Sequence, residues 1–209
     1  MRKAFVALRI CPYAMRGSPI KKRSRENAVK EIHLLFTIVL CAVLIGADQV
    51  FKLLAVRFLQ PIGDVTVIPG VVGLSYVENT GAAFNIFAGQ QILLIVVTGA
   101  VLLFGAYILL FRRPKDWLEY TSIIMVFSGG VGNLIDRVAN GYVVDYIRVL
   151  FMEFAIFNFA DILVCVGFGL LVIAVFRAES RAKKQAEAEK AQMEQDATTP
   201  PTDDGDGPV

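Results

Sequence analysis

Four long apolar segments constrain the fold of this chain more than any other feature. Hydrophobic residues make up 56% of its 209 residues, and the mean hydropathy is +0.58. A bilayer core of roughly 30 Å is crossed by about 20 helical residues. Segments of sufficient length lie at about 33–52, 90–111, 117–136 and 157–177. The sequence therefore predicts an all-α membrane protein with four transmembrane helices.

The basic residues predict how these helices are oriented. Residues 1–31 hold nine Lys or Arg, and more basic residues follow the fourth segment from Arg177 onward. Arg112, Arg113 and Lys115 fill the short connection between the second and third segments. Such residues are enriched on the cytoplasmic side of membrane proteins. We therefore expect both termini in the cytoplasm, and the connections 53–89 and 137–156 outside.

Composition divides the chain into three parts. A basic cytoplasmic extension covers 1–32, the four-helix transmembrane domain covers 33–177, and a charged tail covers 178–209. We expect this tail to begin as a helix and to end disordered, because its end is rich in Pro, Thr, Asp and Gly. No cleavable signal peptide is expected, since Arg9 interrupts the short apolar stretch near the start. Met15 is an alternative start of translation.

The first outer connection contains two β-branched runs. They are Asp64–Gly70 and Val71–Val77, and turn residues lie between them. Short runs of this kind, bounded by Gly and Pro, are typical of strands. The sequence predicts a small extracytoplasmic β-sheet between the first and second transmembrane helices.

Several classes of function are disfavoured by what the sequence lacks. The basic residues are not interleaved with aromatic ones, so no nucleic-acid partner is expected. Cys11, Cys41 and Cys165 have no paired spacing and are read as small buried hydrophobes. The only histidine, His33, lies at the cytoplasmic start of the first helix, which excludes a His-Glu-x-x-His zinc hydrolase and an outer Ser–His pair. No metal or cofactor is predicted.

Polar residues that are unusual for a membrane segment gather at one face in this topology. All of them fall near the outer ends of the helices or in the outer connections. An ionisable residue at membrane depth is costly and marks a candidate functional site. We therefore expect one polar site at the outer membrane–water boundary. Its members are Asp48, Lys52, Asn79, Asn133, Asp136, Arg137, Asp145, Asn158 and Asp161.

Two of these residues, Asp145 and Asp161, suggest acid–base chemistry. In a poorly solvated site two close carboxylates do not both ionise easily, so one keeps its proton. The ionised one can take a proton from water while the other donates one, as in aspartic peptidases. Their spacing leaves proximity open. The alternative is that both only cap helix ends or form ion pairs with Arg137, Arg148 or Lys52.

Serine nucleophiles are weaker candidates. Ser128, followed by Gly129 and Gly130, has no basic partner, and small residues there favour helix packing. Ser75 with Lys52 would form a Ser–Lys dyad, but this leaves the surrounding Asn and Asp residues unexplained.

Two other functions stay open on residue grounds. A small transporter would use Asp48, Asp136 and Asp161 as a proton relay. Transport sites usually lie near the bilayer midplane, whereas these polar residues lie at one face. A non-catalytic membrane scaffold that uses the tail for partners is the second alternative.

Five motifs in order carry a family resemblance. The first two are Asp48-Gln49-Val50-Phe51-Lys52 and Asn79-Thr80-Gly81-Ala82-Ala83-Phe84. They are followed by Gly129-Gly130-Val131-Gly132-Asn133-Leu134-Ile135-Asp136-Arg137, Gly141-Tyr142-Val143-Val144-Asp145 and Phe157-Asn158-Phe159-Ala160-Asp161. With these motifs the chain resembles lipoprotein signal peptidase, also called signal peptidase II, over roughly residues 33–176.

The resemblance implies a function. Members of this family are monomeric aspartic endopeptidases of the bacterial inner membrane that need no cofactor. They remove signal peptides from diacylglyceryl-modified prolipoproteins at the outer face, cutting just before the lipidated cysteine. Lipid-modified prolipoproteins and membrane lipids are thus the implied partners, and globomycin the implied inhibitor.

The resemblance also implies roles for individual residues. It makes Asp145 and Asp161 the catalytic pair and Asp136 a structural partner of neighbouring basic groups. Its implied substrate-binding or supporting residues are Asp48, Lys52, Asn79, Gly81, Asn133, Arg137 and Asn158. The chain departs from the family pattern at Tyr146, where Phe or another apolar residue is common, and in its long extension and tail.

Overall fold

The computed structural model describes residues 19–81, 87, 89–112, 114 and 116–198. The chain forms two compact units, residues 1–40 and residues 41–209. The fold below is that of the second unit, together with the helix α1, which begins in the first unit. The expectations for the first 18 residues, for Ala82, Ala83 and Phe84, and for the Pro-rich end of the tail lie outside the described residues.

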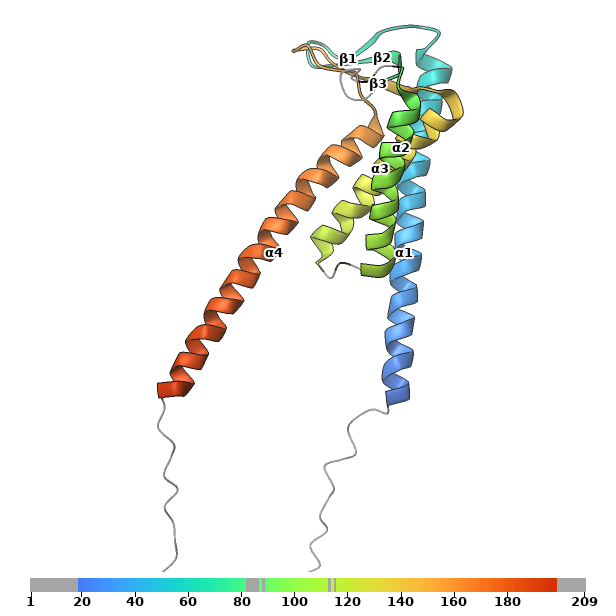
Figure 1. Cartoon of the computed structure of the whole chain (residues 1–209). Helices are drawn as coiled ribbons and strands as arrows, with labels where there is room; N and C mark the ends of the chain where they lie inside the picture. The colour runs from blue at the N-terminus through green and yellow to red at the C-terminus, as the bar shows by residue number, and fades with distance from the viewer. Residues whose placement is uncertain (1–18, 82–86, 88, 113, 115, 199–209) are drawn as a thin grey trace, which may run out of the picture. The chain divides into compact units, whose positions relative to one another are not determined.

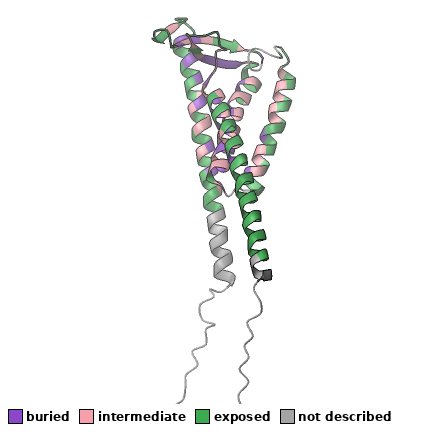
Figure 2. Cartoon of the chain, turned by 90° about the vertical axis from the view of Figure 1, so that its left-hand side faces the viewer, coloured by how far each residue is buried: buried purple, intermediate pink, exposed green. Residues whose placement is uncertain are grey.

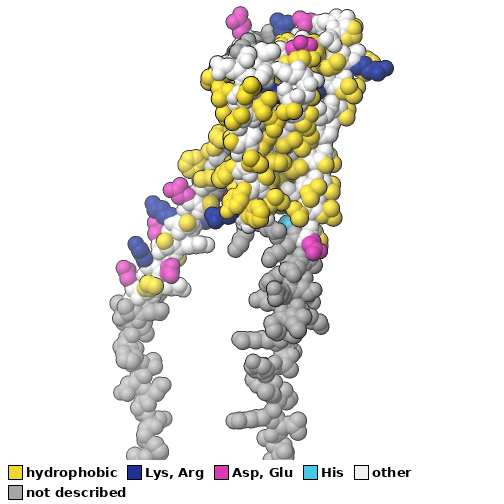
Figure 3. Space-filling view, turned by 45° about the vertical axis from the view of Figure 1, so that its right-hand side comes forward, with side chains coloured by type: hydrophobic (Ala, Val, Ile, Leu, Met, Phe, Trp, Pro, Cys, Tyr) yellow, Lys and Arg dark blue, Asp and Glu magenta, His cyan; other side chains and the backbone are white. Residues whose placement is uncertain are grey.

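Within the residues that the structure describes, four helices are long and apolar enough to cross a membrane, as predicted. The first and second each continue into a short π-helical turn, η2 and η4. The elements are α1 (Pro19–Leu54), η2 (Ala55–Leu59), α2 (Gln91–Tyr107), η4 (Ile108–Arg112), α3 (Trp117–Asn140) and α4 (Phe159–Thr198). Side chains on one face of the molecule are largely hydrophobic along these helices, as suits a surface in contact with lipid (Figure 3).

Three helices extend beyond the apolar segments predicted for them, and α1 already begins at Pro19 instead of near 33. The third helix does not stop at 136 but runs to Asn140, where Gly141 ends it with φ of 81°. Glycine adopts this left-handed conformation without strain and is the usual residue after a helix end. α4 continues past 177 to Thr198, as expected for the start of the tail, since the tail is rich in Ala, Glu and Lys, which are good helix formers. Its residues 175–194 are exposed throughout (Figure 2).

A three-stranded antiparallel sheet lies at one end of α2, α3 and α4, away from the α2–α3 connection (Figure 1). Its order is β1 (Val65–Ile68), β2 (Val72–Asn79) and β3 (Val143–Val149). The first two strands were predicted. The third comes from the second outer connection and was missed, although its Val, Tyr and Ile content is typical of a strand.

The two faces of β3 have different surroundings because successive side chains of a strand point to opposite sides. Val144 and Tyr146 are buried in a small core with Ala55 and Leu59 of η2. Val143 and Asp145 alternate with them and face away from that core. Asp145 is thereby held on a strand whose opposite face is packed.

The packing of α3 against α4 is the most extensive between helices and needs glycine at the contact. A Cβ added to Gly129 would collide with the backbone oxygen of Ala160, and one on Gly167 would lie 2.8 Å from Cβ of Met125. The first turn of α4, where Asp161 lies, is therefore pressed closely against α3.

Candidate active site

The segment between Asp145 and Asp161 folds back on β3. Phe157 forms an isolated antiparallel bridge with Ile147, with backbone N–O distances of 2.8 and 3.1 Å. This bridge brings Asn158 beside Asp145. The side-chain nitrogen of Asn158 donates to Oδ1 of Asp145 at 2.7 Å, and its backbone nitrogen donates to Oδ2 of Asp161 at 3.1 Å. The two carboxyl groups thus lie on either side of one residue.

The N-terminus of α4 is capped by side chains from α1, from β3 and from the residue that precedes the helix. Asn158 accepts from the backbone nitrogen of Asp161 at 3.0 Å, which completes a reciprocal capping box. The hydroxyl of Tyr146 accepts from Phe159 N at 3.2 Å, and Asp48 Oδ1 accepts from Ala160 N at 3.0 Å. Because these N–H groups have no partner within a helix, the caps fix where its first turn lies.

Asp145 is almost completely enclosed, with 1% of its surface exposed. Its Oδ2 accepts a hydrogen bond from the side-chain amide of Asn79 at 2.9 Å. Burial raises the pKa of Asp145 to about 6, and the nearby charge of Asp161 acts in the same direction, while the amides of Asn79 and Asn158 oppose it. Asp145 therefore retains a proton more readily than an exposed aspartate.

Asp161 receives a second hydrogen bond, from the Asn133 side chain at 2.8 Å. The oxygen of the same amide accepts from Lys52 Nζ at 2.8 Å and from Asn158 at 3.1 Å. Asp161 also lies in the first turn of α4, where the helix dipole favours a negative charge. Asp161 thus accepts two hydrogen bonds at the N-terminal end of a helix.

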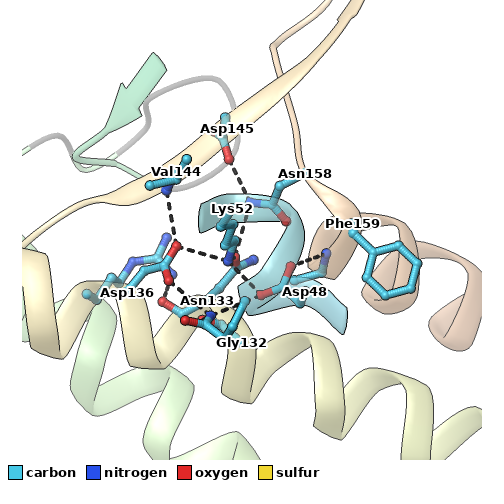
Figure 4. A network of polar contacts seen from close by, with 12 residues as sticks. Asp48, Lys52, Gly132, Asn133, Asp136, Val144, Asp145, Asn158 and Phe159 are labelled. Carbon is cyan, nitrogen blue, oxygen red and sulfur yellow. Dashed lines mark hydrogen bonds and ion pairs between the residues drawn. The ribbon is translucent and has the colours of Figure 1, made fainter. Parts of the chain in front are cut away.

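A buried charge network lies close to Asp145 (Figure 4). Lys52 forms ion pairs with Asp48 and Asp136, both at 2.9 Å. Asp136 also accepts from the backbone nitrogen of Val144 at 3.1 Å. The expected contact between Asp136 and a basic group is thus present.

Gln49 belongs to this network but was not among the predicted site residues. Its side-chain nitrogen lies 3.2 Å from Oδ2 of Asp48 and from the Gly132 carbonyl, and 3.1 Å from Asp136 Oδ1. Its position directly after Asp48 on an apolar helix was the available signal.

Arg137 and Gly81 complete the set of predicted positions. The guanidinium of Arg137 donates to the Gly81 carbonyl at 3.0 Å, and Gly81 N donates to Asn79 at 2.9 Å. The Nε of Arg137 is buried without a hydrogen-bond partner among the described residues. All ten residues expected at the site, Asp136 included, therefore lie in one connected cluster.

The cluster opens onto a cavity of about 930 Å³. Asp145, Asp161, Asn133 and Arg137 lie on its polar side. Its apolar lining comes from β2, β3, the segment before α4 and α4 itself. These residues are Val77, Val143, Phe154, Ala155, Ile156, Phe157, Ile162, Val164, Cys165 and Val166. Two carboxyl groups thus face a largely apolar space.

The serine alternatives do not form. Ser75 donates to Asp64, and the three donors of Lys52 go to Asp48, Asp136 and Asn133, so the two do not make a Ser–Lys dyad. Ser128 is fully buried inside the helix packing.

Comparison with known proteins decides the family. A family model described as signal peptidase (SPase) II matches residues 40–177. The chain belongs to this family. It is 42% identical over 142 residues, 68% of this chain and 93% of the relative, to the lipoprotein signal peptidase of Lactococcus lactis subsp. cremoris (strain MG1363). It is 41% identical over 144 residues, 68% of this chain and 92% of the relative, to that of Streptococcus pneumoniae (strain ATCC BAA-255 / R6).

Solved structures agree with this assignment. A bacterial membrane enzyme determined by the in meso method at 2.3 Å superimposes with a TM-score of 0.65 at 28% identity, covering 70% of this chain and 90% of that one. A second, at 1.9 Å, gives 0.61 at 29% identity, with coverages of 67% and 92%. As a signal peptidase II family member, the chain is a peptidase and a multi-pass membrane protein. The matched range contains the whole polar cluster.

Proposed function

We propose that this chain is an aspartic endopeptidase that removes signal peptides from diacylglyceryl-modified prolipoproteins. It cuts before the lipidated cysteine at the outer face of the bacterial inner membrane. The observation that carries this proposal is that Asp145 and Asp161 share Asn158 as a hydrogen-bond donor and both line one largely apolar cavity. The names of the relatives support the substrate class.

The surroundings of the two carboxyl groups suggest a division of labour. Asp161, at the N-terminus of α4, serves as the base, because it accepts hydrogen bonds from Asn133 and from the backbone of Asn158 and lines the cavity. Asp145 carries the shared proton, since burial raises its pKa to about 6. A pair that holds one proton between two carboxylates is the arrangement that aspartic peptidases use.

The reaction then proceeds in two stages. Asp161 takes a proton from a water molecule whose oxygen attacks the scissile carbonyl carbon, while Asp145 gives its proton to the carbonyl oxygen. In the second stage the proton held by Asp161 passes to the leaving nitrogen. The carbon–nitrogen bond breaks, and the intermediate's hydroxyl proton returns to Asp145. No covalent bond forms between the enzyme and the substrate.

The apolar lining supports a lipidated substrate. Phe154, Phe157 and Ile162 lie on the same cavity as the two carboxyl groups. A diacylglyceryl group and the apolar part of a signal peptide both gain from removal from water. The lipid would stay at the level of the outer leaflet, which holds the adjacent peptide bond near the carboxyl pair.

A cleavage assay with lipidated and unlipidated prolipoprotein tests the proposal. Wild type should cut only the lipidated form, and globomycin should block it. Asp145→Asn and Asp161→Asn should each lower kcat by about a thousandfold or more, because a side-chain amide cannot act as a general acid or base near neutral pH. Insertion into the membrane should be unchanged in both variants.

Asp64→Asn is the matched control. Asp64 is exposed, forms an ion pair with Arg148 at 2.9 Å, and does not line the cavity. Its variant should cleave at nearly the wild-type rate, since exposed ion pairs contribute little to stability. Normal turnover by either Asp145→Asn or Asp161→Asn would refute the aspartic mechanism.

A further inference from the structure

The ammonium group of Lys52 lies at the centre of the network in Figure 4. Only 3% of this residue is exposed. Its nitrogen contacts Asp48 and Asp136 at 2.9 Å each and Asn133 Oδ1 at 2.8 Å. A lysine ammonium has three N–H donors, so every donor is used and the position of the group is fixed.

Two of these contacts lead directly to the residues that precede the proposed catalytic pair. Asp136 accepts a hydrogen bond from the backbone nitrogen of Val144, which precedes Asp145 on β3. Asp48 accepts from the backbone nitrogen of Ala160, which precedes Asp161 on α4. One ammonium group therefore joins β3 and the first turn of α4, in each case at the residue before a carboxyl group.

The third contact fixes an amide. Because Asn133 turns its oxygen toward Lys52 and Asn158, its NH₂ group points at Asp161. The opposite orientation would place the amide oxygen against the Asp161 carboxylate, which repels it. Lys52, together with Asn158, thus orients the Asn133 amide so that its NH₂ group faces Asp161.

We infer that Lys52 is a positioning residue that sets the spacing of Asp145 and Asp161 and the orientation of Asn133. This inference rests on the proposed function. Lys52 is not among the residues that line the cavity, so it acts through its partners and not on the substrate. A buried ion pair is by itself weak support for stability, which leaves placement as the stronger reason for this arrangement. Arg137 is the other cation near the pair.

The first test replaces Lys52 by Met, which has a similar length and no donor. We expect kcat for lipidated prolipoprotein to fall on the order of 100-fold, the effect of a small misplacement of reacting groups. Affinity for the substrate should change by no more than about twofold when Asp145→Asn is compared with Asp145→Asn/Lys52→Met. A kcat near that of wild type would overturn the inference, and so would a parallel loss of affinity.

The second test does not depend on folding of the Lys52 variant. Asp48→Asn and Asp136→Asn each keep an oxygen for the backbone N–H group but lose the ion pair with Lys52. If Lys52 couples the Asp48 contact with α4 to the Asp136 contact with β3, the two losses should not multiply. The double variant should then lose much less activity than the product of the two single losses. A loss in the double variant that equals the product of the two single losses, within about twofold, would show that the two contacts act independently. It would overturn the inference.

The outcomes also separate this inference from the proposed function. Cleavage by wild type and its loss in Asp145→Asn support the proposed function whatever the Lys52 variants do. Full activity of Asp145→Asn would refute the proposed function, and the Lys52 inference would fall with it.

Discussion

At the scale of single residues, Asn158 does the most to define the site. It donates to both proposed catalytic carboxyl groups and also caps α4. The sequence marked Asn158 as a supporting position through its motif. It did not reveal that this residue lies between the two aspartates, because that depends on a backbone bridge between Ile147 and Phe157.

Tyr146 shows how a departure from the family pattern is accommodated. Its hydroxyl accepts from Phe159 N at 3.2 Å. Burial raises the pKa of Tyr146 to about 12, so the hydroxyl stays neutral beside the carboxyl groups. The residue serves as an additional cap for α4, a role that its place in the motif did not suggest.

The pH dependence of cleavage follows from Asp145. Its pKa is raised to about 6, so the pair holds a proton below this pH and loses it above. We expect kcat/KM to fall as the pH rises through about 6. Asn79→Leu removes a donor that favours the ionised carboxylate, so it should move this fall to higher pH.

Measuring kcat/KM of wild type and of Asn79→Leu across the pH range would check the prediction. Asn140→Leu, at an exposed position of α3, is the control and should keep the wild-type profile. A shift of the Asn79→Leu profile to lower pH would contradict the assignment of the proton to Asp145.

At the scale of elements, the contact of α3 with α4 sets the position of Asp161. A Cβ atom added to Gly167 would lie 2.8 Å from Cβ of Met125 and 2.9 Å from the carbonyl oxygen of Ser122. Gly169, two residues along the same helix, has no such neighbour within 4 Å. The two positions therefore form a matched pair for testing the importance of close packing.

Gly167→Ala should destabilise the protein by about 1–3 kcal/mol, because the added methyl group has no space. Gly169→Ala should be neutral or stabilising by up to about 1 kcal/mol, since alanine favours a helix. Unfolding in detergent, followed by circular dichroism, would measure both. Equal stability of the two variants would show that α3 and α4 pack less closely than described.

At the scale of the whole molecule, the charge pattern predicts an orientation that the contacts do not test. We expect the segment after β3 on the outside and the exposed part of α4 in the cytoplasm. Met152 and Ser180 are both exposed and lie before and after the apolar part of α4. They are suitable sites for labelling from one side of the membrane.

In a chain whose own cysteines are replaced, a membrane-impermeant maleimide should label Met152→Cys in intact cells. Ser180→Cys should react only after the membrane is permeabilised. The reverse pattern would place the carboxyl pair on the cytoplasmic side and contradict the proposed site of cleavage.

The sequence alone determined the four membrane helices, two of the three strands and the residues of the polar cluster except Gln49. Apolar length and the ordered motifs are local properties, so they can be read along the chain. The tertiary structure decided what depends on contacts between distant residues. β3 pairs with β2, Phe157 returns to β3, and Lys52 meets Asp136 across helices. Spacing along a sequence does not encode such contacts, and they alone bring Asp145 and Asp161 to one cavity.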